Sequence, residues 1–196
     1  MLSEYEWQVT PQSAFGISEA DETGLTFVEN AILKARHAAA RSKCITIADD
    51  SGLAVDALDG APGVRSARFA GSGASDRANI DRLLQRLTDV PDPLRTARFH
   101  CVMVLLRHPE DPCPLIGQGA WDGVILRSPI GDSGFGYDPV FFLPDRGCTA
   151  AQLQPGEKNF LSHRGQALRA LVEKIRNSHW SDLRSHVESN TGTPKI

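Results

Sequence analysis

Residues 96–107, with the sequence TARFHCVMVLLR, form the longest strand candidate in the chain. Apolar residues alternate with polar ones at the start of this run, and both sides become apolar further on. Such a pattern indicates a strand that lies inside a sheet, near its centre. The turn HPEDPCP follows, and residues 115–126 predict an antiparallel partner in which Gly117 and Gly119 permit a bulge or a bend. The chain is therefore expected to fold around a β-sheet.

Three further segments carry apolar residues at helical spacing, and these are residues 26–42, 75–90 and 162–175. In the first of them, Thr26 and Glu29 have the spacing of a capping box. Short strands are expected at residues 5–9, 44–48, 53–58 and 140–143, and a single helical turn at 149–153. Neither a repeat nor a linker divides the chain. We therefore expect one domain over residues 1–176 and a frayed polar tail over 177–196.

Composition narrows the classes of partner. The 196 residues include 21 Lys and Arg against 24 Asp and Glu, so the net charge of −3 predicts no binding to nucleic acid or to an anionic membrane. A hydrophobic content of 41% is enough for a sizeable core. No run of 18 apolar residues occurs and the first residues lack the pattern of a secretory signal, which predicts a cytoplasmic protein. The four cysteines have no C-x-x-C spacing and are expected to be structural thiols.

Paired carboxylates suggest a metal site. Asp49 and Asp50 follow the apolar run CITIA and are expected at the carboxyl end of a buried strand, where ligands bind in open α/β sheets. Mg²⁺ suits such a position because it is commonly held by one or two carboxylates together with substrate phosphates. The alternative is that D-D-S-G forms a turn capped by aspartate. Glu22, just before the first helix, either complements the helix dipole or joins Asp50 if the fold brings the two together.

A glycine-rich loop and a basic cluster suggest a site for a nucleotide. In residues 134–139, GFGYDP, the glycines allow a ligand close to the backbone and the rings offer a stacking surface; the alternative is a bent turn with core aromatics. Lys158, His163 and Arg164 form the basic cluster, and the last two fall in the first turn of the final helix. Cations there oppose the helix dipole, which favours a bound anion over plain surface charge.

Long motifs in the same order closely resemble the inosine/xanthosine triphosphate pyrophosphatase family, whose members clear non-standard purine nucleotides from the precursor pool. The resemblance covers about residues 18–171. The motifs are ETGLTFVENAILKARHAA, ADDSGLAVDALDGAPGVRSARFAG, RFHCVMVLL, GFGYDPVFF and EKNFLSHRGQAL.

The resemblance implies an α/β fold, with a long curved mixed sheet flanked by helices in two lobes and an active-site cleft between them. It also implies a homodimer, a requirement for Mg²⁺, and hydrolysis of ITP, dITP or XTP to the monophosphate and pyrophosphate. In that reaction water near Asp50 attacks the α-phosphorus. A donor such as Arg164 would favour the 6-keto group of hypoxanthine or xanthine over the amino group of adenine.

The family's functional residues are carried onto matching positions of this chain. Asp50 would be the general base and a metal ligand, and Glu22 the second metal ligand. Asp49 and Glu29 would be supporting acids. The substrate would be bound by Ser51, Phe135, Gly136, Tyr137, Asp138, Lys158, His163 and Arg164.

The chain departs from the family's pattern at its start. Members normally open with a buried strand and a Thr/Ser-x-Asn-x-x-Lys loop that grips the triphosphate, and neither is found here. This predicts lower stability and activity than those of a full-length homologue. Two explanations stay open: a misassigned or shortened start of an ordinary enzyme, or a truncated homologue that binds nucleotides weakly or serves only as a dimer partner.

Overall fold

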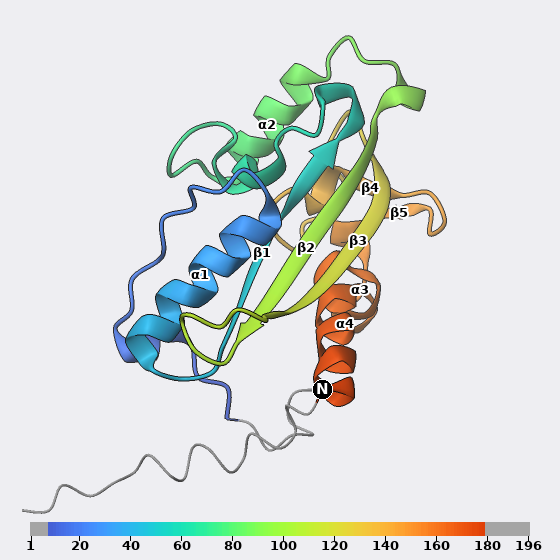
Figure 1. The fold of residues 1–196 in the computed structure, drawn as a ribbon. Coiled ribbons are helices and arrows are strands. Elements are labelled where there is room, and N and C mark those ends of the chain that lie inside the picture. Colours follow the sequence, from blue (N-terminus) through green and yellow to red (C-terminus); the bar gives the residue numbers. More distant parts are fainter. Residues whose placement is uncertain (1–7, 179–196) are drawn as a thin grey trace, which may run out of the picture.

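The computed structural model describes residues 8–178, in which a twisted sheet has helices on both faces (Figure 1). The strand order is β1-β2-β3-β4-β5. The strands are β1 (Thr46–Val55), β2 (Thr96–Leu106), β3 (Leu115–Ile125), β4 (Phe141–Leu143) and β5 (Cys148–Thr149). The helices are α1 (Phe27–Ser42), α2 (Asp76–Arg86), α3 (Pro155–Leu161) and α4 (His163–Asn177). Short 3₁₀ helices lie at Gln12–Phe15, Asp56–Leu58, Gly63–Arg68, Asp92–Leu94, Asp138–Val140 and Ala150–Gln152.

The expected α/β fold is confirmed, and its two longest strands form the predicted hairpin. β2 lies between β1 and β3. Every pairing between described strands is antiparallel, whereas the resemblance implied a mixed sheet. The capping box of α1 is present, because the side chain of Thr26 accepts from the N–H of Glu29 and the carboxylate of Glu29 accepts from the N–H of Thr26.

Alternate residues of the interior strand β2 contact different helices. Val102, Val104 and Leu106 pack against Ala31 and Ala35 of α1. On the other face, Cys101, Met103 and Leu105 pack against Ala167, Leu171 and Ile175 of α4. The sheet is therefore covered on both faces, as the apolar character of both sides of β2 predicted.

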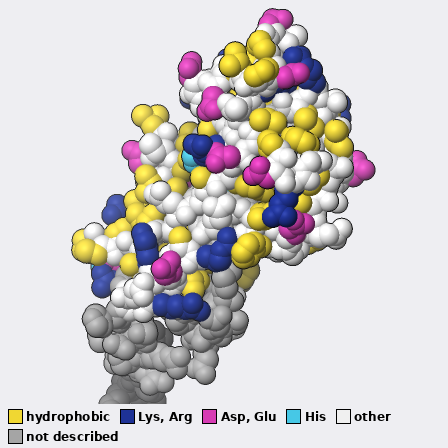
Figure 2. All heavy atoms as spheres, turned by 90° about the vertical axis from the view of Figure 1, so that its right-hand side faces the viewer, with side chains coloured by type: hydrophobic (Ala, Val, Ile, Leu, Met, Phe, Trp, Pro, Cys, Tyr) yellow, Lys and Arg dark blue, Asp and Glu magenta, His cyan; other side chains and the backbone are white. Residues whose placement is uncertain are grey.

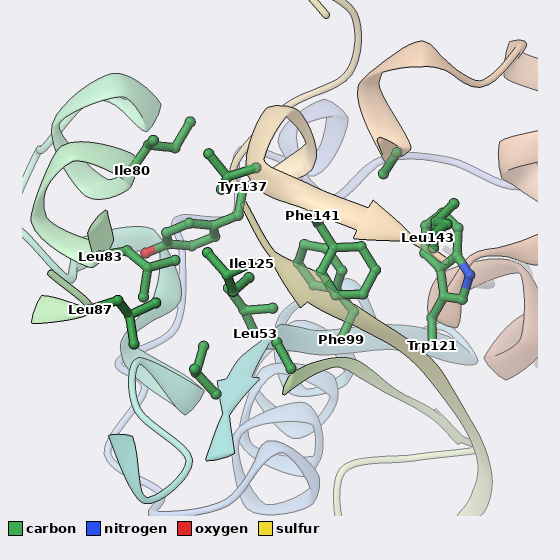
Figure 3. Packing of buried hydrophobic residues seen from close by; sticks show 14 of the residues in the cluster. Leu53, Ile80, Leu83, Leu87, Phe99, Trp121, Ile125, Tyr137, Phe141 and Leu143 are labelled. Atoms are coloured by element: carbon green, nitrogen blue, oxygen red, sulfur yellow. The ribbon is translucent and has the colours of Figure 1, made fainter. Parts of the chain in front are cut away.

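Further along the sheet, the core is built around aromatic rings. Phe99 of β2 and Phe141 of β4 have ring centroids 4.5 Å apart, and Trp121 of β3 lies against Phe141 (Figure 3). Leu53 and Tyr137 belong to the same cluster, to which α2 contributes Ile80 and Leu83. This cluster fixes β1 and the loop before β4 relative to each other.

The two strands expected at residues 44–48 and 53–58 are one strand, so Asp49 and Asp50 lie inside β1 and do not follow it. The expected place of the two acids at the carboxyl end of a strand is therefore wrong, and so is the alternative of a turn at D-D-S-G. Position 52 of the strand requires glycine, because a Cβ there would lie 2.4 Å from the carbonyl oxygen of Gly63 and 2.6 Å from Oγ of Ser66. Close packing against the following loop, and not a turn, accounts for this glycine.

Gly117 and Gly119 also serve close packing. The pairing of β2 with β3 is continuous through both glycines, so the expected bulge is absent from this part of the described hairpin. A Cβ on Gly117 would lie 2.3 Å from the carbonyl oxygen of Ala167, and one on Gly119 would lie 2.1 Å from that of His163. The bare backbone of β3 thus lets the first turns of α4 lie directly on the sheet.

The structure also differs from the sequence-based expectations in where some helices and strands begin and end. Residues 155–161, for which no element was predicted, form α3, and the single residue Ser162 separates it from α4. The strand expected at 5–9 falls mostly outside the described residues, and residues 8 and 9 are in no strand. Of the expected tail, only residues 177 and 178 are described, and Asn177 ends α4.

Charged side chains of both signs are interspersed on the face drawn in Figure 2. Ion pairs elsewhere in the described chain include Arg127 with Asp92 at 2.7 Å and Arg146 with Glu157 at 3.0 Å. None of the described helices is long and apolar enough to span a membrane.

Candidate active site

Adjacent carboxylates of β1 face opposite sides of the sheet, because successive side chains of a strand alternate. Asp50 points to the side of α1 and Asp49 to the side of α4. A pocket of about 220 Å³ lies across this part of β1 and receives groups from both sides. Its lining consists of Glu22, Lys34, Asp49, Asp50, Ser51, Val64, Ala67, Arg68 and Arg164.

On the α1 side, the fold brings Glu22 to Asp50, as the hypothesis of a shared site requires. The two carboxylates are joined by Lys34, whose Nζ lies 2.6 Å from Oε1 of Glu22 and 2.6 Å from Oδ1 of Asp50. Arg68 donates to the other oxygen of Glu22 at 2.6 Å. Two acids and two cations therefore meet at the mouth of the pocket.

The surroundings of Asp50 and Glu22 move their pKa values in opposite directions. Burial raises the pKa of Asp50 above its usual value, although the hydrogen bond from Lys34 opposes this shift. Partial burial also acts to raise the pKa of Glu22, but the bonds from Lys34 and Arg68 outweigh it and hold that pKa low. Divergent pKa values in one site are typical of a carboxylate pair with separate roles, in which Asp50 is the better base and Glu22 stays ionised.

Sequence reasoning missed two residues of α1 that hold Asp50. Asn30, which is fully buried, donates to Oδ2 of Asp50 at 3.3 Å and accepts from the N–H of Gly24 at 2.8 Å. It thereby ties Asp50 to the loop that carries Glu22. Lys34 is one turn further along the same helix face, four residues after Asn30. A buried position occupied by Asn in an otherwise apolar helical pattern was the available signal.

On the α4 side, Arg164 is held by β1. Its guanidinium donates to Oδ2 of Asp49 at 2.9 Å and 3.1 Å and to Oγ of Ser51 at 3.1 Å. The fold thus brings Ser51 and Arg164 to the same pocket as Asp50. Asp49, expected only as a supporting acid, is the residue that positions Arg164.

The glycine-rich loop contributes one exposed ring. Phe135 is 58% exposed and lies under two cations, with Nζ of Lys158 4.8 Å and the guanidinium carbon of Arg164 5.6 Å from its centroid. Through Arg164, this ring adjoins the pocket. An exposed aromatic ring beside two cations is suited to stacking on a purine base.

The rest of that loop is structural. Tyr137 lies in the core and its hydroxyl donates to the carbonyl oxygen of Ser66 at 2.9 Å, so it is not part of an open wall (Figure 3). Asp138 is buried and pairs with Lys158, and it also accepts from the N–H of Phe135. The N–H of Gly136 donates to Asp76 at the start of α2. These bonds fix the loop so that Phe135 stays at the surface.

His163 is buried behind Arg164, stacked on Phe99 with ring centroids 4.7 Å apart. Burial, with the charges of Arg164 and Lys158, lowers its pKa to about 3. Its Nδ1 is the one buried side-chain nitrogen or oxygen among the described residues that lacks a hydrogen-bond partner. The neutral ring adds no charge to the start of α4, and Asp49 offsets the charge of Arg164. The positive charge at the start of α4 is thus compensated by the protein's own groups, so the helix dipole does not by itself require a bound anion.

Burial of neutral His163 predicts acid sensitivity. Because its folded pKa of about 3 lies below the ordinary value of 6.5, the unfolded chain binds the extra proton between these pH values. Stability is therefore lost as pH falls from 6.5 towards 3, by about 1.4 kcal/mol per pH unit, or about 2 kcal/mol at pH 5. Urea unfolding at pH 7.5 and pH 5 should show that His163→Gln loses less stability on acidification than the wild type, by about that amount. An equal loss in both proteins would contradict the assignment.

The donor set fits a divalent cation bound together with a substrate. No group of three or more His, Cys, Asp or Glu side chains within residues 8–178 is arranged to hold a metal ion. Two carboxylates are available in Glu22 and Asp50, and a cation, the ammonium of Lys34, already stands between them. Hard carboxylate oxygens completed by phosphate oxygens are the usual ligands of Mg²⁺, so the residues present suit it.

A larger hollow of about 410 Å³ lies on the sheet next to the start of α1, lined among others by Phe27, His100 and Gln118. No Asp, Glu, Lys or Arg lines it. Because the pocket on β1 combines three cations with three carboxylates, it is the better candidate for a site that binds a charged ligand, although it is smaller.

The fold and the pocket describe an α/β protein whose cationic pocket, with an exposed aromatic ring beside it, suits an anionic ligand that carries a flat base. A family model described as the Ham1 family matches residues 1–174. The chain is 58% identical to the dITP/XTP pyrophosphatase of Shigella flexneri over 177 residues, which cover 90% of each protein. It is 56% identical to the dITP/XTP pyrophosphatase of Escherichia coli (strain K12) over the same length. The chain belongs to the Ham1 family, and it is a hydrolase.

Solved structures agree with this assignment. A HAM1 protein from Coxiella burnetii superposes with a TM-score of 0.83 at 47% identity, covering 90% of this chain and 93% of that one. The Ham1 protein of Staphylococcus aureus superposes with a TM-score of 0.77 at 40% identity, covering 85% of this chain and 84% of that one. The fold of this chain is thus shared with both of these solved Ham1 proteins.

Proposed function

We propose that this protein hydrolyses the non-standard purine nucleotides dITP, ITP and XTP to the monophosphate and pyrophosphate, with Mg²⁺, and so removes them from the nucleotide pool. The observation that carries the proposal is the pocket on β1, where Asp50, with its raised pKa, lies beside ionised Glu22 in a lining that also contains the three cations Lys34, Arg68 and Arg164. High identity to curated dITP/XTP pyrophosphatases supports the choice of substrate.

Asp50 is the general base of the proposed reaction. Its carboxylate accepts a proton from water, and the water oxygen bonds to the α-phosphorus as the bond from that phosphorus to the α–β bridging oxygen breaks. The electron pair of the broken bond leaves with pyrophosphate. In the metal-free protein both Lys34 and Asn30 hold Asp50 from α1, and Asn30 fixes the orientation of its carboxylate. A base whose pKa is raised towards neutrality is better matched to this proton transfer than an ordinary aspartate.

Glu22 and Asp50 would hold the Mg²⁺. When bound, the ion neutralises charge on the phosphate oxygens and so stabilises the leaving pyrophosphate. Arg68 supplies further positive charge beside Glu22, with planar donors that suit phosphate oxygens.

The purine base would lie against Phe135, whose ring has Lys158 and Arg164 over it. Arg164 can donate to a 6-keto oxygen, whereas adenine presents an amino donor there and would leave that N–H group of the arginine without an acceptor, at a cost of about 1–3 kcal/mol. Ser51 and Asp49 hold Arg164 for this contact. Four of the predicted substrate-binding residues would not contact the nucleotide themselves but would support Phe135 and the start of α4. These are Gly136, Tyr137, Asp138 and His163.

A homodimer in the cytoplasm fits the proposal, since the nucleotide pool is there and the family resemblance implies a dimer. Nucleic acid and membranes are not expected as partners, because the proposed substrate is a free nucleotide.

The experiment is hydrolysis of dITP and XTP by the purified protein in the presence of Mg²⁺, with dATP as the control substrate and pyrophosphate release as the measurement. We expect kcat/KM for dITP and XTP to exceed that for dATP by at least about tenfold, which corresponds to 1.4 kcal/mol of discrimination. Equal turnover of dATP, or release of phosphate in place of pyrophosphate, would refute the proposal.

A further inference from the structure

The ammonium of Lys34 lies among three oxygens. Its Nζ is 2.6 Å from Oε1 of Glu22, 2.6 Å from Oδ1 of Asp50 and 3.2 Å from the carbonyl oxygen of Asp49. Three donors of one ammonium thus meet three acceptors. Carboxylate and carbonyl oxygens are also the ligands that a hard divalent cation prefers.

The charges at this point are balanced without a metal. Glu22 and Asp50 provide two negative charges, and Lys34 and Arg68 provide two positive ones. A divalent cation added to this arrangement would give an excess of two positive charges within a few ångströms. Repulsion of that kind is strong in a partly buried site, so the cation and the Lys34 ammonium cannot share the same oxygens.

We propose that Lys34 is the resident counter-ion of the metal pocket, which holds Glu22 and Asp50 together in the metal-free protein and is displaced when the divalent cation binds. This inference rests on the proposed function, in which Glu22 and Asp50 hold the metal. Asn30 stays bonded to Asp50 when Lys34 leaves, so the base keeps one anchor on α1.

The side chain of Lys34 is able to leave. It is 27% exposed, whereas that of Asp50 is 7% exposed, so the lysine can reach solvent and the aspartate cannot. A lysine carries its charge on a flexible four-carbon stem, unlike the planar, bidentate arginine. Arg68 binds the opposite oxygen of Glu22 and can remain in place.

The first test measures binding of Mn²⁺ to the nucleotide-free protein, by isothermal titration calorimetry and by the electron paramagnetic resonance signal of free Mn²⁺. Because Lys34→Met removes the competing charge, we expect its Kd for Mn²⁺ to be about tenfold lower than that of the wild type. Arg36→Met removes an exposed cation from the same helix and should leave the Kd unchanged. An unchanged or higher Kd in Lys34→Met would overturn the inference.

The second test uses the wild-type protein and does not depend on the folding of a variant. Acetic anhydride labels free lysine amines, and peptide mass spectrometry reports each site. We expect Mg²⁺ to increase labelling of Lys34 several-fold and to leave labelling of the exposed Lys43 unchanged. Labelling of Lys34 that stays constant or falls with Mg²⁺ would count against displacement.

Glu22→Gln separates this inference from the function on which it rests. If the wild type binds Mn²⁺ and Glu22→Gln weakens that binding, the metal pocket stands, and the Lys34 results alone decide the inference. If the wild type does not bind Mn²⁺, or if Glu22→Gln binds it equally well, the metal pocket and the inference both fail.

Discussion

Replacing Asp50 by asparagine is expected to lower kcat/KM for dITP by about 10²–10⁴-fold, the usual contribution of a positioned general base. Asparagine preserves the shape of the side chain and one hydrogen-bond acceptor for Lys34, but it cannot take a proton from water. The loss should appear mainly in kcat, because Asp50 acts on the attacking water. The purine and most of the triphosphate are bound by other residues, so KM should change little. Steady-state kinetics with dITP and Mg²⁺ provide the measurement.

The control for Asp50→Asn is Asp59→Asn. Asp59 lies just after β1, is exposed and has a positive φ of 51°, a conformation that asparagine tolerates. The control should keep wild-type kinetics. If Asp50→Asn hydrolyses dITP as fast as the wild type does, Asp50 is not the base, and a nucleotide-binding protein with little catalysis of its own becomes the better account.

Gly119→Ala is expected to destabilise the protein by about 3 kcal/mol, at the upper end of overpacking effects. The new Cβ would lie 2.1 Å from the carbonyl oxygen of His163 and 2.6 Å from the backbone nitrogen of Ala167. Both atoms belong to the backbone of α4, so no change of rotamer relieves the clash and the helix has to shift from β3. Urea denaturation gives the free energy of unfolding.

The same shift should impair the site, because Arg164 is in the first turn of α4 and reaches Asp49 and Ser51 across a short distance. We therefore expect KM for dITP to rise in Gly119→Ala even at temperatures where the variant is folded. Gly156→Ala is the matched control, since it is in helix α3 and nothing lies within 4 Å of its added Cβ. A Gly119→Ala protein as stable as this control would show that α4 does not lie tightly on β3.

Much of the fold is predictable because its elements carry local signals. The capping box at Thr26 and Glu29 marks the start of α1, and alternation followed by a doubly apolar run identifies β2. The strand β1 was divided in two because Asp, Ser and Gly favour turns in isolation. Its continuity depends on packing of Gly52 against Gly63 and Ser66, which are distant in sequence, and no local pattern records such a contact.

Some members of the pocket were predictable from the sequence, but their arrangement was not. The resemblance singled out Glu22, Asp50, Ser51 and Arg164, and the fold places all four around one pocket. Their residue types cannot reveal that Asp49 and Asp50 face opposite sides of a strand, or that Tyr137 and His163 are buried supports. Lys34 and Asn30 escaped notice because their role arises only when α1 packs next to Asp50.

Hydrolysis of dITP in water enriched in ¹⁸O tests most directly the central claim, that water attacks the α-phosphorus with Asp50 as the general base. The products are separated and their masses measured by mass spectrometry. Attack on the α-phosphorus with Asp50 as base predicts one ¹⁸O atom in dIMP and none in pyrophosphate, and loss of this labelled product in Asp50→Asn. Label in pyrophosphate, or formation of dIDP and phosphate, would contradict the account.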